Sequence, residues 1–310
     1  MVLLALLSLP TLYWPHGLER AQDLKTAGIE RVSVPPDQAD TWRKAGFTVM
    51  PLGAADLASR EALLPPGILA RANVASPTRR PWASVNGWRV LRNPGGKYIY
   101  DLPAGSAALA AAEAFAYGAD AVLKIDPADL PDLGKMLAFL KALPDVHLPG
   151  IADLAVVDDG SAETGEVMNV LVRRNLLFRV VRTPAPQFRI NIQLGAKEYP
   201  RSDAADPIAF ALGIRRQLTD EQRSLRIYGS ETVIGRLTGD RRRARLHLLN
   251  YAQREVEGLR IRVRGTFRRG EACLPERGRV PLEDLAVADG FTEFSLPAIG
   301  SYVVIDLGQR

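Results

Sequence analysis

Two aspartates at the ends of strand-like runs could form a catalytic pair. Asp101 ends the run "YIYD", and Asp126 follows "AVLKI" directly before Pro127. Two carboxylic acids about 5 to 9.5 Å apart can cleave a glycosidic bond, one donating a proton and the other acting as nucleophile or base. Asp126 has a structural alternative, because an Asp before a Pro at the first helical position is a natural N-cap. The sequence does not show whether the two carboxylates meet.

Tyr13, Trp14 and His16 stand just before the first predicted helix and are candidates for ligand contact. At the carboxyl end of a parallel strand, the aromatic faces could stack on a sugar ring and the imidazole could hydrogen-bond a hydroxyl. Lys124 ends another predicted strand and is a further binding candidate. In the alternative, Tyr13 and Trp14 plug the end of the sheet while His16 caps the helix.

Residues 76–103 interrupt the regular pattern with a stretch rich in Pro, Gly, Trp and Tyr. Long irregular segments within an α/β unit are often functional loops. Trp82, Asn86 and Trp88 could supply stacking and hydroxyl recognition there, so they are predicted to bind substrate. The alternative is a packed surface loop.

We predict no metal site and no cofactor. His16, His147 and His247 are far apart in the sequence, and the chain has a single cysteine, Cys273. The adjacent pair Asp158 and Asp159 could bind a cation, but capping of the following helix is the favoured interpretation. The sequence contains neither a G-x-S-x-G elbow nor a phosphate-binding Walker loop.

The elements that would position these residues alternate between strand and helix. Helix-like segments ending at Gly28 and Gly46 are each followed by a strand-like run, "IERVSV" and "FTVMPL". Such repetition is typical of a parallel α/β sheet or barrel. Residues 68–74 and 120–125 are predicted as further strands, and "AGSAALAAAEAFAYG" as a buried helix.

Three domains are predicted from the changes in pattern. Residues 1–146 form an α/β domain, and "PDVHLPG" looks like a linker. Residues 147–222 contain a strand, an acidic turn, a helix and a second strand, which together make a small α/β unit. Residues 223–310 alternate apolar and polar side chains around turn signals, which predicts an antiparallel β-sandwich.

This order resembles multidomain glycoside hydrolases of the β-galactosidase type, in which a TIM barrel precedes a glutamine-amidotransferase-like domain and a C-terminal β-sandwich. The resemblance rests on the aromatic-rich first strand end, on "VMNVLVRRNLLFRVV" and on "RLHLLNYAQREVEGLRIRV". It implies a carbohydrate-active protein, either a hydrolase of poly- or oligosaccharides or a non-catalytic glycan-binding or interaction protein with a degenerate hydrolase fold.

The first domain departs from that family in two ways. Residues 1–146 are far fewer than the about 250 residues of a full barrel, so a shortened or incomplete TIM-like barrel is expected. Glu30, Glu61 and Glu113 fall at a strand start or within helix patterns, so none matches a catalytic glutamate of the family. The resemblance therefore assigns no catalytic residue.

The composition predicts a folded chain, and its modest positive charge permits anionic partners without requiring them. The 310 residues are 47% hydrophobic and carry a formal net charge of +5. Arginines cluster late in the chain: Arg243 and Arg245 share one strand face with His247, and Arg260, Arg262 and Arg264 share another. If those faces adjoin, they form a cationic patch suited to acidic glycans or a polyanion; otherwise they are solvated sheet faces. No motif for specific nucleic-acid binding is present.

The opening segment "MVLLALLSLPTL" has two interpretations. It is apolar enough for the core of an export signal, which would make the protein secreted or periplasmic, but it lacks a preceding basic residue and a typical cleavage site. It could equally be a buried first strand. No segment is long and apolar enough for a predicted membrane span.

Overall fold

The computed structural model describes residues 9–69, 82–252 and 254–309. The chain divides into two compact units. The first contains Met1–Gly67 and Asn93–His147, and the second contains Ile68–Arg92 and Leu148–Arg310. The described residues 68–69 and 82–92 therefore cluster with the later part of the chain.

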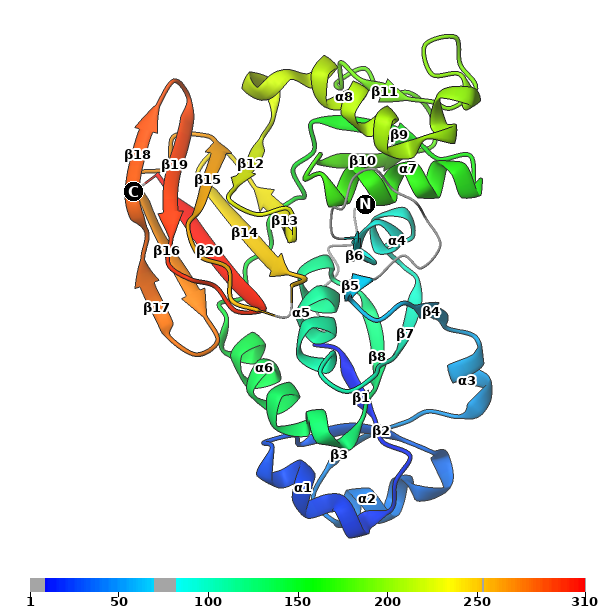
Figure 1. Cartoon of the computed structure of the whole chain (residues 1–310). Coiled ribbons are helices and arrows are strands. Elements are labelled where there is room, and N and C mark those ends of the chain that lie inside the picture. Colours follow the sequence, from blue (N-terminus) through cyan, green and yellow to red (C-terminus); the bar gives the residue numbers. More distant parts are fainter. Residues whose placement is uncertain (1–8, 70–81, 253, 310) are drawn as a thin grey trace. The chain divides into compact units, whose positions relative to one another are not determined.

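The first unit is built on a parallel sheet with the strand order β3-β2-β1-β8-β7-β4 (Figure 1). The strands are β1 (Thr11–Tyr13), β2 (Arg31–Val34), β3 (Thr48–Pro51), β4 (Glu61–Leu63), β7 (Lys97–Asp101) and β8 (Asp120–Lys124). The predicted parallel α/β sheet is therefore confirmed. In the described part of the chain β3 and β4 form its two edges, and the sheet does not close into a barrel.

Helices lie between these strands in sequence, and two more follow the last strand, β8. They are η1 (Leu18–Arg20), α1 (Ala21–Thr26), η2 (Pro36–Gln38), α2 (Ala39–Lys44), α3 (Ala54–Ala58), α5 (Ala107–Tyr117), η3 (Pro127–Asp129) and α6 (Leu130–Ala142). Gly28 and Gly46 follow α1 and α2 with φ angles of 72° and 93°, which only glycine adopts readily. Both predicted helix stops are confirmed.

Helix α6 packs closely against the end of α1 at a glycine. A Cβ atom on Gly134 would stand 2.9 Å from the carbonyl carbon of Ala27, and closer still to its oxygen. Backbone atoms cannot move aside as a flexible side chain can. The glycine therefore sets the distance between α6 and α1.

We expect Gly134→Ala to destabilise the protein by about 1 to 3 kcal/mol, because overpacking outweighs the helix propensity of alanine. Gly213→Ala is the matched control, since Gly213 also lies within a helix but a Cβ there would meet nothing within 4 Å. The control should stabilise by up to about 1 kcal/mol. Urea unfolding followed by circular dichroism measures both, and equal effects would contradict the close packing.

The second unit contains a three-stranded parallel sheet in the order β10-β9-β11. The elements of its α/β part are β6 (Trp82–Ser84), α4 (Gly87–Arg92), β9 (Leu154–Val157), α7 (Ala162–Arg173), β10 (Phe178–Val181), β11 (Asn191–Ile192), η4 (Arg201–Ala205) and α8 (Pro207–Gln222). A separate pair of strands is formed by β6 with β5 (Gly67–Leu69). The rest of the strand predicted at 68–74 lies outside the described residues.

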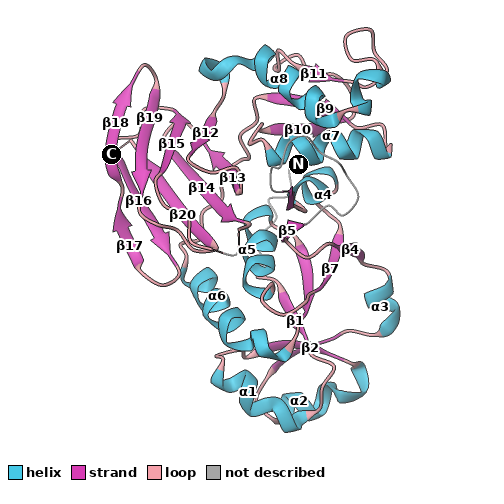
Figure 2. Cartoon of the chain, in the orientation of Figure 1, coloured by secondary structure: helices cyan, strands magenta, loops and turns pink. Residues whose placement is uncertain are grey.

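Two antiparallel sheets make up the remainder of the second unit (Figure 2). The four-stranded sheet has the order β12 (Leu225–Tyr228), β15 (Leu259–Arg264), β19 (Phe291–Leu296), β18 (Glu283–Ala288). The five-stranded sheet has the order β13 (Val233–Gly239), β14 (Arg243–Asn250), β20 (Tyr302–Gly308), β16 (Arg269–Leu274), β17 (Gly278–Pro281). Ile261 and Phe294 of one sheet share a hydrophobic core cluster with Leu246 and Ile305 of the other.

The two arginine stripes do not adjoin. Arg243 and Arg245 lie on β14 in the five-stranded sheet, whereas Arg260 and Arg262 lie on β15 in the four-stranded sheet. Arg260 and Arg262 instead form ion pairs with Glu293 on the neighbouring strand β19. The idea of one combined cationic patch is therefore wrong, because the chain between β14 and β15 changes sheets.

No helix in the described ranges is long and apolar enough to cross a membrane. The first eight residues of the opening apolar segment lie outside those ranges, and β1 begins at Thr11.

Candidate functional site

Three of the predicted site residues occupy one row at the carboxyl edge of the six-stranded sheet. Asp101 on β7 pairs in register with Lys124 on β8. Leu12 pairs with Leu123, so the next residue, Tyr13, continues that row on β1. Residues in register on neighbouring strands point to the same side of a sheet. The fold therefore brings Asp101, Lys124 and Tyr13 to one face from three different strands.

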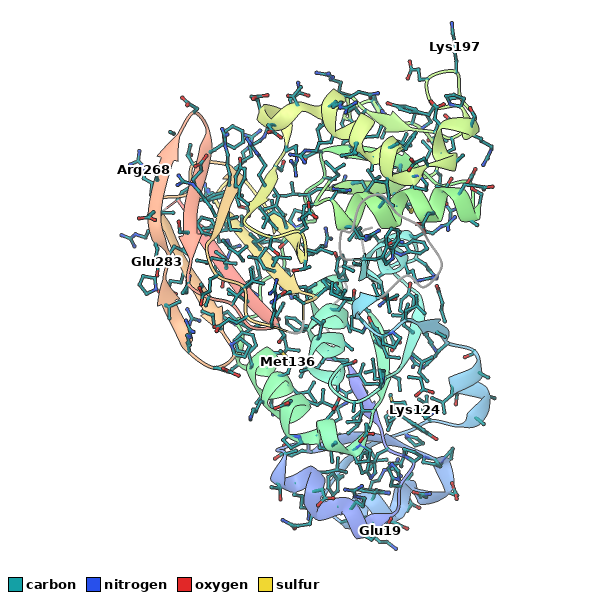
Figure 3. The ribbon with its side chains drawn as sticks, in the orientation of Figure 1. Glu19, Lys124, Met136, Lys197, Arg268 and Glu283 are labelled. Atoms are coloured by element: carbon teal, nitrogen blue, oxygen red, sulfur yellow. The ribbon has the colours of Figure 1, made fainter. Side chains whose placement is uncertain are left out.

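Asp101 and Lys124 also form an ion pair. The Lys124 Nζ donates to an Asp101 carboxylate oxygen at 2.8 Å. Their side chains are 75% and 47% exposed for Asp101 and Lys124, so this pair lies in solvent and contributes little to stability. Figure 3 labels Lys124 at the end of β8. Both groups are consequently accessible to a ligand.

Asp126 lies two residues beyond Lys124 and caps the helical turn that follows. Its carboxylate accepts a hydrogen bond from the backbone N–H of Ala128 at 2.9 Å. The side chain is exposed on its remaining sides. The capping role left open by the sequence is present, and the same carboxylate follows the strand that neighbours Asp101.

Trp14 supports this edge from within the core. Its indole is only 1% exposed, and the ring meets His16 edge to face with centroids 4.7 Å apart. Its backbone N–H donates to the carbonyl of Ser33 at 2.7 Å, which extends the pairing of β1 with β2. No face of the Trp14 ring is open for stacking in this structure, whereas Tyr13 and His16 are half-buried. Trp14 therefore packs beneath His16 and fills the end of the sheet, which was the alternative to ligand contact.

Two further residues at this edge were missed by the sequence reasoning. Ser33 pairs with Tyr13, and its buried hydroxyl has no hydrogen-bond partner among the described residues. Asp129 is buried and accepts backbone hydrogen bonds from Gly105, Ser106 and Ala107 at 2.7 to 3.1 Å. It thereby fixes the segment that follows Asp101. The sequence does offer a signal for Asp129, because it is a second acidic residue three positions after Asp126.

The other three predicted binding residues belong to the second unit. The Arg173 guanidinium lies 3.2 Å from the ring centroid of Trp82, and Arg89 lies 4.5 Å from that of Trp88. Trp88 also packs on α7, because a Cβ on Gly165 would stand 3.0 Å from its ring. Asn86 is buried at the start of α4. Residues 82–92 thus form a strand and a helix that contact α7, while 76–81 lie outside the described residues.

The adjacent aspartates Asp158 and Asp159 are held in a hydrogen-bond network at the start of α7. Arg92 donates hydrogen bonds from Nε and Nη2 to both carboxylate oxygens of Asp158, and these lower the pKa of that carboxyl despite its partial burial. Partial burial also opposes ionisation of Asp159, but hydrogen bonds from Ser161, Thr164 and Arg201 hold its pKa well below the usual range.

Ser161 caps α7 by accepting from the Thr164 N–H. The capping interpretation of this segment is confirmed. Among the residues that the structure describes, no group of three or more His, Cys, Asp or Glu side chains is placed to hold a metal ion.

The chain matches no protein-family model and no curated protein. Among solved structures it is similar to alpha-L-fucosidase isoenzyme 2 from Paenibacillus thiaminolyticus, with 11% identity and a TM-score of 0.55 over 94% of this chain and 72% of that one. It also matches the beta-galactosidase from Bacillus circulans sp. alkalophilus, with 10% identity and a TM-score of 0.42 over 90% of this chain and 63% of that one. The similarity to the fucosidase extends over nearly the whole chain, and the chain therefore has a glycoside hydrolase-like fold.

Proposed function

We propose that the protein is carbohydrate-active and that it acts as a glycoside hydrolase on a poly- or oligosaccharide. The observation that carries the proposal is the row of Asp101, Lys124 and Tyr13 at the carboxyl edge of a parallel sheet, with Asp126 just beyond it. Ligands of parallel α/β folds bind at this edge because the connecting loops there present side chains from several strands. The glycoside hydrolase-like fold supports a sugar as the ligand.

The strand order supports a barrel that is open on one side. Read from one edge to the other, the strand order is β4-β7-β8-β1-β2-β3. The strands are in sequence order if the count starts at β1, runs to β3, passes to β4 at the other edge and ends at β8, which lies beside β1. A closed TIM barrel has the same cyclic order, in which the last strand pairs with the first. We infer that the first unit is a shortened barrel that opens between β3 and β4, that the three-stranded parallel sheet is the amidotransferase-like part, and that the two antiparallel sheets form a sandwich.

In this proposal the two aspartates divide the chemistry of glycosidic bond cleavage. One carboxyl group donates the proton to the leaving oxygen. The other either activates a water molecule that attacks the sugar carbon, or attacks that carbon itself to form a glycosyl-enzyme that water then hydrolyses. Asp101 is exposed in the free protein, so the bound sugar itself would supply the desolvation that an acid in such a site requires. Tyr13 would contact the ring and His16 a hydroxyl, with Trp14 holding the imidazole in place.

The proposal is tested by Asp101→Asn and Asp126→Asn on a panel of aryl glycosides. We expect each change to reduce kcat by at least about a hundredfold while substrate binding survives, because an amide can neither carry the proton nor act as an anionic nucleophile. Asp132→Asn is the matched control, since Asp132 is an exposed acidic residue of α6 that pairs with Lys135 of the same helix. The control should keep full activity.

The Asp126 variant separates catalysis from helix capping. Asparagine caps a helix about as well as aspartate, so a purely structural Asp126 predicts unchanged activity and an unchanged melting temperature. If the unmodified protein binds glycans but hydrolyses none of the aryl glycosides, the hydrolase proposal is wrong. The protein would then be a non-catalytic glycan-binding protein.

A further inference from the structure

A groove with a volume of about 1350 Å³ lies at one end of the five-stranded sheet in the second unit. It is formed by the turn between β13 and β14, the end of β20, the start of β16, and β17 with the segment that follows it. The groove is rich in arginine: its basic lining residues are Arg242, Arg243, Arg269 and Arg279. None of these residues was predicted to belong to the site in the first unit.

Two of the arginines flank a glycine. Arg243 on β14 and Arg269 on β16 are both in register with Gly308, which lies between them on β20. The two arginines therefore point to the same side of the sheet, roughly 10 Å apart at their backbones, which is two strand spacings. Gly308 has no side chain to fill the space between them. The result is a notch with a guanidinium on each side.

The acidic residues of the groove are already engaged. Glu271 pairs with Arg279, and Asp306 accepts two hydrogen bonds from the buried Arg245. The Asp240 carboxylate accepts the backbone N–H groups of Arg242 and Arg243, which fixes the turn that carries them.

Arg242, Arg243 and Arg269 are exposed, and within the described part of the chain no carboxylate lies within ion-pair distance of their side chains. These three positive charges are consequently available to a ligand.

We propose that this groove binds an anionic oligosaccharide, with one carboxylate or sulfate group seated between Arg243 and Arg269. A guanidinium offers parallel N–H donors that match such groups in a two-bond geometry. Beside the charges the groove presents apolar carbons of Pro281, Leu282 and Leu285, against which the C–H face of a sugar ring can lie. This inference rests on the proposed function in one respect, because the ligand is taken to be a carbohydrate.

A nucleic acid fits the groove less well than a short acidic sugar. Binding a phosphate backbone needs a continuous basic track. Here Asp240, Glu271 and Asp306 interrupt the arginines. The described residues that line the groove also include no aromatic side chain on which a base could stack.

The test measures binding of fluorescently labelled tetragalacturonate and of its fully methyl-esterified, uncharged form by anisotropy at low salt. A sulfated carrageenan tetrasaccharide separates sulfate from carboxylate recognition, and an oligo-dT serves as the nucleic-acid probe. The variants are Arg243→Gln and Arg269→Gln, with Arg268→Gln as the control for charge, because Arg268 is an exposed neighbour outside the groove lining (Figure 3). Gly308→Val fills the notch while keeping both arginines.

We expect at least one acidic tetrasaccharide to bind about tenfold more tightly than the ester, and both groove variants to weaken it by about tenfold. Gly308→Val should weaken it similarly with an unchanged melting temperature, whereas Arg268→Gln should change it by less than about twofold. Equal binding of acid and ester, equal effects of Arg243→Gln and Arg268→Gln, or tighter binding of oligo-dT would overturn the proposal.

Turnover of neutral aryl glycosides by the same variants keeps the two proposals apart. The groove variants should retain whatever activity the unmodified protein has. Activity without acid binding refutes the groove alone, and acid binding without activity refutes the hydrolase alone.

Discussion

Replacing Trp14 by alanine is expected to lower the free energy of unfolding by about 3 to 5 kcal/mol, the range for a buried aromatic side chain. The indole is 1% exposed and packs against His16, so its removal leaves a cavity in the core beneath the carboxyl edge of the parallel sheet. Urea unfolding followed by circular dichroism measures the loss. A small loss of stability accompanied by weaker glycan binding would contradict this and place the ring in the binding site.

Trp14→Phe is the informative partner of that variant. Phenylalanine keeps most of the apolar ring but removes the indole N–H, which is buried without a hydrogen-bond partner among the described residues. An unpaired buried donor is itself unfavourable, so its removal offsets part of the lost contact. We expect this variant to lose no more than about 2 kcal/mol. A loss as large as that of alanine would show that the N–H has a partner, such as a bound water.

Lowering the pH is expected to destabilise the protein through His247. Burial, with the nearby charges of Arg245 and Arg236, lowers the pKa of this histidine to about 3. In the unfolded chain a histidine has a pKa of about 6.5. Between these values the unfolded state binds a proton that the folded state does not. The free energy of unfolding therefore falls as the pH falls through this window, and the contribution of His247 is fully present above it. The full loss is on the order of 5 kcal/mol.

Two variants identify the source of this pH dependence. His247→Gln removes the titrating group, so the fall between about pH 6.5 and 3 should become shallower. Tyr302→Phe removes the hydroxyl that lies 2.6 Å from His247 Nδ1 but leaves the ring and the burial. It should cost about 1 kcal/mol at neutral pH and keep the fall. An identical pH profile in the unmodified protein and in His247→Gln would rule out this histidine as the cause.

Local signals in the sequence predicted the elements of this fold well. The stops at Gly28 and Gly46 need only a helix end with a positive φ angle, and the alternation after residue 223 needs only strands with one buried face. The capping roles of Asp126 and Ser161 likewise depend on a few adjacent residues. Such features are decided within one or two turns of the chain, so a single sequence reveals them.

Features that depend on distant partners could not be predicted. Whether Trp14 points into the core or toward a ligand depends on the register of β1 with β2, which the segment itself does not encode. The sequence leaves open whether the arginine stripes adjoin, because β14 and β15 follow each other along the chain, but β14 pairs with β20 and β15 with β19. Residues 82–92 contact the start of α7, some seventy positions later, through interactions such as the hydrogen bond from Arg92 to the carbonyl of its N-cap residue Ser161. Long-range strand pairing settles the first two, and long-range side-chain contacts settle the third.

The placement of β20 also bears on the order in which the five-stranded sheet can form. It is the latest of the described strands in sequence, yet it lies between β14 and β16 and hydrogen-bonds to both. Two hairpins of this sheet, β13 with β14 and β16 with β17, are synthesised earlier. The edges of β14 and β16 stay unpaired until β20 has been synthesised and pairs with both. Open strand edges invite pairing with other chains. The newly made chain is therefore most vulnerable to aggregation in the interval before its residues 302–308 are available.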